Sequence, residues 1–254
     1  DGDFRVPIDP IDVSVNTTAS EAEKARVLAD EKQEQMLLRA AVHVELARVQ
    51  RVLYHICVAK LKADAEAGMP YSERTYTLVC DYGQNMELPV FNKEQLGCSY
   101  YYSPLGIYNF GVVNHAHKYG DGTIDAHLHA HVYNEGVGKK GANNVASLLM
   151  KTLWAEQIIR EDEVGGELYV VFDNCTGQNK NNTVLKLLVF LAECGYFKKV
   201  NFIFLIVGHT KNSADRLFNS LKKLYHDKNL YTMPQLLETL NTSDQVMVHA
   251  TQPS

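Results

Sequence analysis

The stretch LYVVFDNCTGQNKNN, residues 168–182, decides the fold. It opens with an apolar run of the length and β-branched or aromatic content that is typical of a buried strand. The polar residues after Phe172 predict a turn, and a helical pattern follows from about Thr183 to Cys194. A buried strand followed by a helix is the repeating unit of a parallel α/β sheet. Asp173 therefore stands where such a strand ends.

The flanking residues extend this alternation in both directions. Strand patterns cover residues 76–80, 100–113, 126–133 and 200–207, and helical patterns cover 143–159, 213–225 and 233–240. The order βββαβαβα predicts one mixed α/β sheet, with an antiparallel three-stranded meander beside two parallel strands. In such a sheet the first and fourth strands can lie side by side at the centre.

A long helical pattern precedes the sheet, from about Ser20 to Ala67. A helix of this length outreaches a small domain, so we expect it either to break or to project towards another subunit. Its apolar stripe favours packing on its own core or in a homodimer. The stripe consists of Leu38, Val42, Leu46, Val49, Leu53 and Ile56. The predicted parts are an extended arm at 1–18, a helical arm at 19–70, an α/β domain at 71–240 and a polar tail at 241–254.

Composition limits the function. The formal net charge of −5 argues against a protein that coats nucleic acid indiscriminately. Five widely spaced cysteines without a CxxC pair indicate neither a disulfide framework nor a zinc knuckle. No apolar run approaches the roughly 20 residues that cross a bilayer, and the first residues lack the features of a secretory signal, so we expect an intracellular protein without a membrane anchor.

Three aspartates stand where chemistry is expected. Asp81 follows the first strand in TLVCDYGQN, Asp173 follows the fourth, and Asp215 opens the helix after the fifth. If the first and fourth strands are neighbours, Asp81 and Asp173 share one crevice, and Asp215 reaches it from the helix. Clustered carboxylates suit hard divalent cations, and two ions roughly 4 Å apart can clamp both oxygens of an in-line phosphoryl displacement. The sequence therefore points to metal-dependent chemistry on phosphodiesters, with hard divalent cations as the cofactor.

Other polar residues fit a nucleic-acid substrate. His209 could shuttle a proton or contact a phosphate, or it could be a buried turn histidine. The amide-rich segment 174–182 opens a helix, where backbone N–H groups either hold an anion or are capped by side chains. Lysines in the GVGKKG turn suit a DNA phosphate better than a dinucleotide. The candidate nucleic-acid contacts are Lys139, Lys140, Lys180, Lys211 and Arg216.

Histidines alternate along the predicted third strand at His127, His129 and His131, after His115 and His117. A Zn²⁺ cluster is geometrically conceivable. No catalytic partner is evident nearby, so we favour histidines on the solvent face of an edge strand.

Several strings resemble a known family. CDYGQNMELP, YNEGVGKKGANNVAS, FDNCTGQNKNN, GYFKKV and GHTKNSADRLFNSLKK resemble an uncharacterised domain family of transposon-associated eukaryotic proteins, and through it the chain is similar to DDE/D transposases from about Thr75 to Leu237. The resemblance implies a ribonuclease H-like, retroviral-integrase-like core. It also implies cutting or joining of DNA in the nucleus with Mg²⁺ or Mn²⁺, with RNA not excluded as a substrate.

The sequence departs from that pattern at the third acid, because no Glu stands at the spacing typical of DDE enzymes. Asp215 takes this place, and Glu135 is the substitute if Asp215 is not a ligand. The alternative function is a domesticated domain of the same fold that has lost catalysis and binds nucleic acid or protein.

Overall fold

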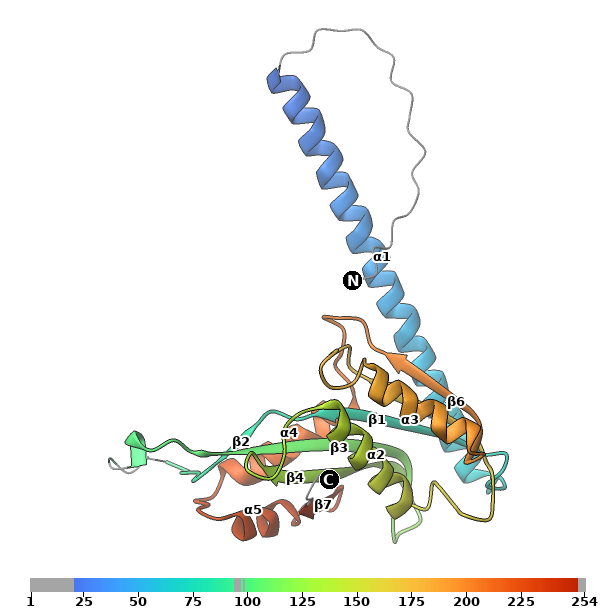
Figure 1. Ribbon diagram of the computed structural model, residues 1–254, viewed down its shortest axis with the longest axis vertical. Helices are drawn as coiled ribbons and strands as arrows, with labels where there is room; N and C mark the ends of the chain where they lie inside the picture. The colour runs from blue at the N-terminus through green and yellow to red at the C-terminus, as the bar shows by residue number, and fades with distance from the viewer. Residues whose placement is uncertain (1–20, 94–96, 98, 251–254) are drawn as a thin grey trace. The chain divides into compact units, whose positions relative to one another are not determined.

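The computed structural model describes residues 21–93, 97 and 99–250 (Figure 1). The expected arm at 1–18 lies outside these residues. Contacts divide the chain into a unit of residues 1–45 and a unit of residues 46–254, which contains the sheet. Within the described part of the chain, no helix combines the length and the apolar character that crossing a membrane requires.

The second unit is built on a mixed sheet. Its described strands are β1 Thr75–Tyr82, β2 Met86–Leu88, β3 Leu105–Lys118, β4 Ile124–Asn134, β5 Gly165–Phe172, β6 Phe197–Phe204 and β7 Val246–Ala250. They follow the order β6-β5-β1-β3-β4-β7, with β2 paired to β3 beside this path. β1, β3 and β4 form the predicted antiparallel meander, and β5 and β6 are parallel to β1. The predicted adjacency of the first and fourth strands, β1 and β5, is confirmed.

Helices cover both faces of the sheet (Figure 1). They are α1 Glu21–Glu66, α2 Ala142–Ala155, α3 Asn182–Glu193, α4 Ser213–His226 and α5 Met233–Leu240. Because side chains of a strand alternate between faces, Leu78 of β1 lies in the core beneath α2 and α3, whereas Val79 lies in the core beneath α4 and α5. The chain is therefore an α/β protein with a three-layer sheet unit.

α1 is one continuous helix of 46 residues, so the first of the two expected alternatives, a break, does not occur. Its second half packs on the sheet unit, but through a different face from the predicted stripe: Ala47, Tyr54 and Leu61 are buried, whereas Leu46 and Val49 are each 53% exposed. Apolar residues occupy two faces of this helix. The face that contains Ala47 is the one that packs on the sheet unit. The expectation that the stripe lies on its own core is therefore wrong.

The predicted tail at 241–254 contains a strand. β7 pairs in parallel with β4, from Leu128↔Val246 to Val132↔Ala250. β4 is consequently an interior strand, and its expected place at the sheet edge is wrong.

Candidate functional site

Asp81 and Asp173 lie at the ends of neighbouring parallel strands. The β1–β5 register pairs Cys80 with Phe172, so the two aspartates occupy the next register position. Val79 and Val171, two residues earlier, both belong to the core beneath α4. Alternation therefore turns both carboxylates towards α4, on strands about 4.8 Å apart.

α4 begins at this point with a capping box. Asn212, the N-cap residue, accepts a hydrogen bond from the Ala214 N–H (2.8 Å), and its own N–H donates to Oδ2 of Asp215 (2.9 Å). The Asn212 side chain also donates from Nδ2 to Oδ2 of Asp81 (3.1 Å). Asn212 thus links the end of β1 to the first turn of α4, where Asp215 lies.

Electrostatics shows that the three carboxylates share one environment. Burial raises the pKa of Asp81 to about 6, and the negative charges of Asp173 and Asp215 add to this effect. Hydrogen bonds from Asn212 and from the Tyr82 N–H (2.8 Å) act in the opposite direction. Both Asp173 and Asp215 are therefore close enough for their charges to act on Asp81, where β1 ends.

Asp173 is oriented by the loop that follows it. Its Oδ1 accepts hydrogen bonds from the Cys175 N–H (3.2 Å) and from Nδ2 of Asn179, whose side chain is fully buried. Asn181 caps α3 by accepting from the N–H groups of Thr183 and Val184, each at 3.1 Å. The amide-rich segment thus serves in capping and turn formation.

Lys140 brings a cation to the same edge. Its Nζ donates to the Gly83 carbonyl oxygen (3.3 Å) and lies 5.0 Å from the centre of the Tyr82 ring. Burial lowers the pKa of Lys140, while the negative charge of Asp81 raises it. Lys140, one of the predicted nucleic-acid contacts, is thus close enough to Asp81 for the two charges to interact.

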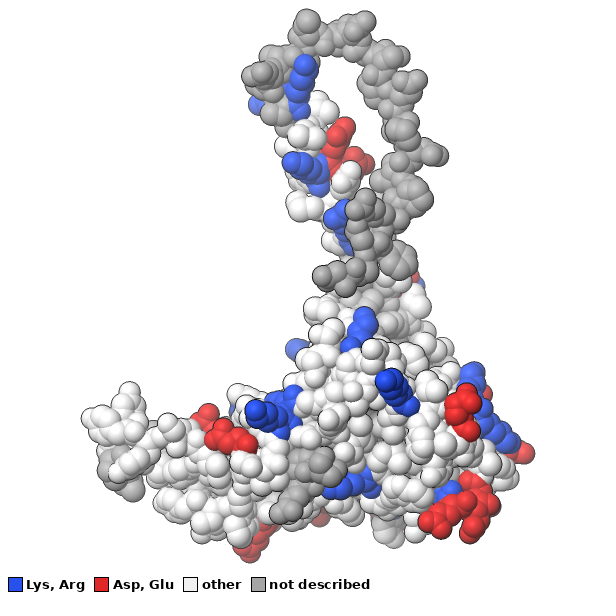
Figure 2. Space-filling model, viewed as in Figure 1, with Lys and Arg blue, Asp and Glu red and all other residues white. Residues whose placement is uncertain are grey.

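Two hollows meet at Asp215. The first, with about 670 Å³ of empty volume, is lined by residues from Tyr82 to Met86 and by α4, including Lys222. The second, about 890 Å³, is lined by Lys211, Arg216 and Lys223. On the side drawn in Figure 2, lysine and arginine side chains are dispersed among uncharged ones. The basic residues that line a hollow together with Asp215 are Lys211, Arg216, Lys222 and Lys223.

Glu135 lies apart from the three aspartates. Glu135 lies beside Gly106 of β3, whose N–H donates to Oε1 of Glu135 (3.0 Å). Asp81, by contrast, pairs with Gly111 of the same strand. Five residues of strand separate Gly106 from Gly111 by roughly 17 Å, so the structure does not bring Glu135 to the site. Lys139 is exposed in the turn after β4, and Lys180 lies 5.9 Å from the centre of the Phe204 ring.

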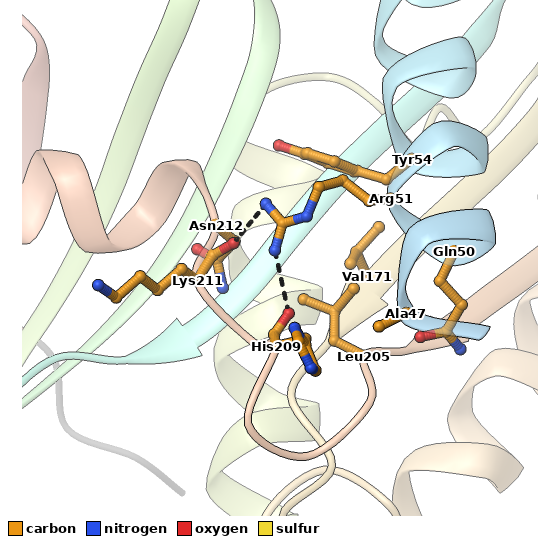
Figure 3. A pocket seen from close by; sticks show the side chains of 9 residues that line it. All are labelled: Ala47, Gln50, Arg51, Tyr54, Val171, Leu205, His209, Lys211 and Asn212. Carbon is orange, nitrogen blue, oxygen red and sulfur yellow. Dashed lines mark hydrogen bonds between the residues drawn. The ribbon is translucent and has the colours of Figure 1, made fainter. Parts of the chain in front are cut away.

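His209 lies on the loop between β6 and α4, where its backbone N–H donates to the Ile206 carbonyl oxygen (2.9 Å). It lines a hollow of about 310 Å³ on the α1 side of the loop (Figure 3).

The carboxylates do not form a closed metal site. Among the described residues, no group of three or more His, Cys, Asp or Glu side chains is arranged to hold an ion. One oxygen of Asp215 is engaged by the Asn212 N–H.

The histidines are not on a solvent face, so that prediction is wrong. His127, His129 and His131 are 6%, 0% and 2% exposed, because β7 covers the edge of β4 and α2 packs over this face. His129 Nε2 lies 2.7 Å from Oε1 of Glu156, and His131 Nε2 lies 2.7 Å from Oγ1 of Thr152. Burial lowers the pKa of His131 to about 3, so this imidazole is neutral in the fold.

Sequence patterns did not reveal Asn212 and Asn179, the two amides that orient the aspartates. The spacing of Asn212 and Asp215 is that of a capping box, which signals a helix start. Its bond to Asp81 spans 131 positions and carries no local signal.

Comparisons with known proteins give a family but no activity. No curated protein and no solved structure matches the chain. Residues 103–253 match a family model described as a domain of unknown function (DUF7869), which includes Asp173 and Asp215 and begins after Asp81. Because the match covers more than half of the sequence, the chain belongs to the DUF7869 family.

Proposed function

We propose that the protein cleaves or joins phosphodiester bonds of DNA with divalent ions, as a DDD-type, transposase-like nuclease that works in the nucleus. One observation carries the proposal. Asp81 and Asp173 end adjacent parallel strands and face the start of α4, and the charges of Asp173 and Asp215 both act on Asp81. Carboxylates placed where their charges repel are costly unless a cation or proton offsets them.

The arrangement of elements supports the finer proposal of a ribonuclease H-like fold. A meander of three strands is followed by two parallel strands, each preceded by a helix, and β1 lies between β5 and β3. This is the order expected from the resemblance to DDE/D transposases. It also brings the carboxyl ends of β1 and β5 together, where a ligand of an α/β sheet is expected.

Carboxylates are the kind of ligand that a hard divalent cation takes, although no group of three is arranged to hold one among the described residues. Asp81 and Asp173 would hold it, with Asp215 completing its surroundings, since oxygen ligands suit Mg²⁺ and Mn²⁺. When bound, such an ion supplies charge neutralisation and a lower pKa for a coordinated water or hydroxyl. Because the pKa of Asp81 is about 6, this carboxylate is largely ionised at neutral pH.

The other groups of the chain would orient and bind. Asn212 holds Oδ2 of Asp81, and Asn179 holds Oδ1 of Asp173, so both carboxylates are fixed before a substrate arrives. Lys140 offers a positive charge for the phosphate at the reacting centre. Lys211 and Arg216, on the other side of Asp215, would bind the neighbouring backbone phosphates.

A second candidate is a catalytically inactive nucleic-acid or protein binding domain of the same fold. The capping role of Asp215 favours it, because an oxygen that accepts the Asn212 N–H is partly withdrawn from a metal. In this case the basic residues beside Asp215 would bind a phosphate backbone without cutting it.

A cleavage assay separates the two candidates. Labelled single- and double-stranded DNA and RNA are incubated with Mg²⁺, Mn²⁺ or a chelator, using wild-type protein, Asp81→Asn and the matched control Asp162→Asn on an exposed loop. The proposal predicts metal-dependent products with wild type and the control, and loss with Asp81→Asn. Binding without products under every condition supports the inactive domain instead.

We further propose that a second copy of the chain covers the exposed stripe of α1. Leu46, Val49, Leu53 and Ile56 follow one another at steps of three, four and three, and they are 44–58% exposed. This spacing is that of helices which pair along an apolar seam.

A further inference from the structure

We propose that Gln50 and Arg51 of α1 are positioning residues, which hold the loop between β6 and α4 and thereby place Asn212 and Asp215. The inference deepens the proposed function and rests on it for its catalytic consequence. Its structural part stands on contacts within residues 46–254 and concerns the loop 205–212.

Gln50 fixes the start of the loop. Its Nε2 donates to the Phe204 carbonyl oxygen (2.9 Å), and its Oε1 accepts from the Ile206 N–H (3.0 Å). One side chain therefore satisfies both backbone groups at the point where the chain leaves the sheet. Leu205, which follows Phe204, still makes a hydrogen bond to the neighbouring strand: its N–H donates to the Phe172 carbonyl oxygen (2.9 Å).

Arg51 holds the end of the loop (Figure 3). Its Nη2 donates to the carbonyl oxygen of His209 (3.2 Å) and its Nη1 to that of Lys211 (3.4 Å). A guanidinium presents its donors in a fixed fork, so it can hold two carbonyl groups that lie two residues apart in one geometry. Gly208, within this loop, has a positive φ of 81°, a conformation that glycine adopts without steric cost.

The contacts continue from the loop into the site. Asn212 directly follows Lys211, and it contacts both Asp81 and Asp215. Tyr54, one helical turn after Gln50, donates from its hydroxyl to Oγ of Ser213 (3.3 Å) at the first position of α4. Three residues of one α1 face thus follow the loop from its first residue to the start of α4.

Apolar side chains accompany these hydrogen bonds. The hollow in Figure 3 lies between α1 and the loop, and it is lined by Ala47, Val171 and Leu205 as well as by the polar residues. Apolar and hydrogen-bonding side chains of α1 and the loop thus face the same hollow. Gln50 and Arg51 precede the matched family region 103–253, so α1 supports a part of the site from outside that region.

Hydrogen exchange measured by mass spectrometry tests the positioning role without any assay of activity. Arg51→Ala and Gln50→Ala are compared with wild type, with Arg51→Lys as the conservative variant. Lys60→Ala, an exposed cation on the same helix, is the control. We expect exchange of amides 206–212 to rise about fivefold in the two alanine variants, because each removes two hydrogen bonds. Exchange of amides in α5 stays unchanged. Exchange of the loop amides in Arg51→Lys is intermediate between wild type and Arg51→Ala.

Loop exchange in Arg51→Ala equal to that in Lys60→Ala would overturn the positioning role. A Mn²⁺ titration of cleavage on the same proteins keeps the two proposals apart. A higher Mn²⁺ requirement in Arg51→Ala, with partial rescue in Arg51→Lys, supports both. A loosened loop in a protein that never cleaves retains the positioning role and refutes the proposed function. Alanine variants that still cleave and show unchanged loop exchange retain the proposed function and refute the positioning role.

Discussion

Nδ2 of Asn212 donates to Oδ2 of Asp81 across 3.1 Å, and this bond joins the N-cap of α4 to the end of β1. The same residue caps α4 and engages Asp215. A local helix-capping residue is therefore also the link between two of the three acids.

We predict two effects of Asn212→Ala. Loss of the cap destabilises the protein by about 1–2 kcal/mol, and loss of the bond to Asp81 raises the pKa of that carboxyl further. Asn181→Ala, which removes the cap of α3, is the matched control: it should destabilise similarly and leave Asp81 unchanged. Urea unfolding and carboxyl NMR titration measure the two effects. Equal Asp81 titration in both variants would contradict the link.

The raised pKa of Asp81 predicts a pH-dependent stability. The folded pKa, about 6, exceeds the ordinary value of 3.8, so the folded state holds this proton more tightly than the unfolded state. Stability from this group is present below pH 3.8 and is lost as the pH rises through 6, by about 1–3 kcal/mol. In Asp81→Asn this loss is absent. The difference in unfolding free energy between wild type and variant should therefore change from pH 4 to 7; a constant difference would refute the raised pKa.

The buried histidines predict the opposite dependence. Burial lowers the pKa of His131 to about 3, so protonation favours the unfolded state, and stability is lost as the pH falls from 6.5 towards 3. We expect His131→Leu to reduce this slope by about 1.4 kcal/mol per pH unit. Thr152 stays satisfied in the variant, because its hydroxyl donates to the Leu148 carbonyl oxygen (3.1 Å). Unfolding at pH 5 and 7 measures the slope, with exposed His226→Leu as control. Equal slopes in the two variants would be inconsistent with a buried neutral His131.

Self-association through α1 gives a fourth prediction. Val49→Glu combined with Leu53→Glu places charges on the exposed seam and should convert a dimer into a monomer, with little change in melting temperature. Val189→Glu, on an equally exposed apolar site of α3, should leave the dimer intact. Sedimentation equilibrium at micromolar concentration decides; a wild-type monomer at these concentrations would rule out the seam.

Local sequence patterns predicted the helices and strands themselves better than they predicted how these elements pair and which residues are buried. The helix at 233–240 was predictable because a capping box of Thr232 and Gln235 marks its start, and the long first helix because apolar residues recur along it at helical spacing. β7 was not, because five residues with one fully buried side chain carry little periodic signal, and their pairing with β4 depends on the whole sheet. Alternation in AHLHAHVYN showed which residues share a face, but not that both faces of the strand are buried.

For the candidate site, the sequence predicted which strands are neighbours but not which residues lie side by side along them. The order of elements placed Asp81 beside Asp173, because adjacency of β1 and β5 follows from topology. The expectation for Glu135 failed because the level of a residue along a neighbouring strand depends on register, and β3 is long enough to hold Glu135 far from Asp81.

The most direct test of the account is calorimetric titration of Mn²⁺ into wild type, Asp173→Ala and the control Asp162→Asn. We expect saturable binding to wild type and the control, and none to Asp173→Ala, because Asp173 and Asp81 would supply the main ligands. Binding to Asp173→Ala with wild-type affinity, or no binding to wild type, would contradict a site built on these carboxylates.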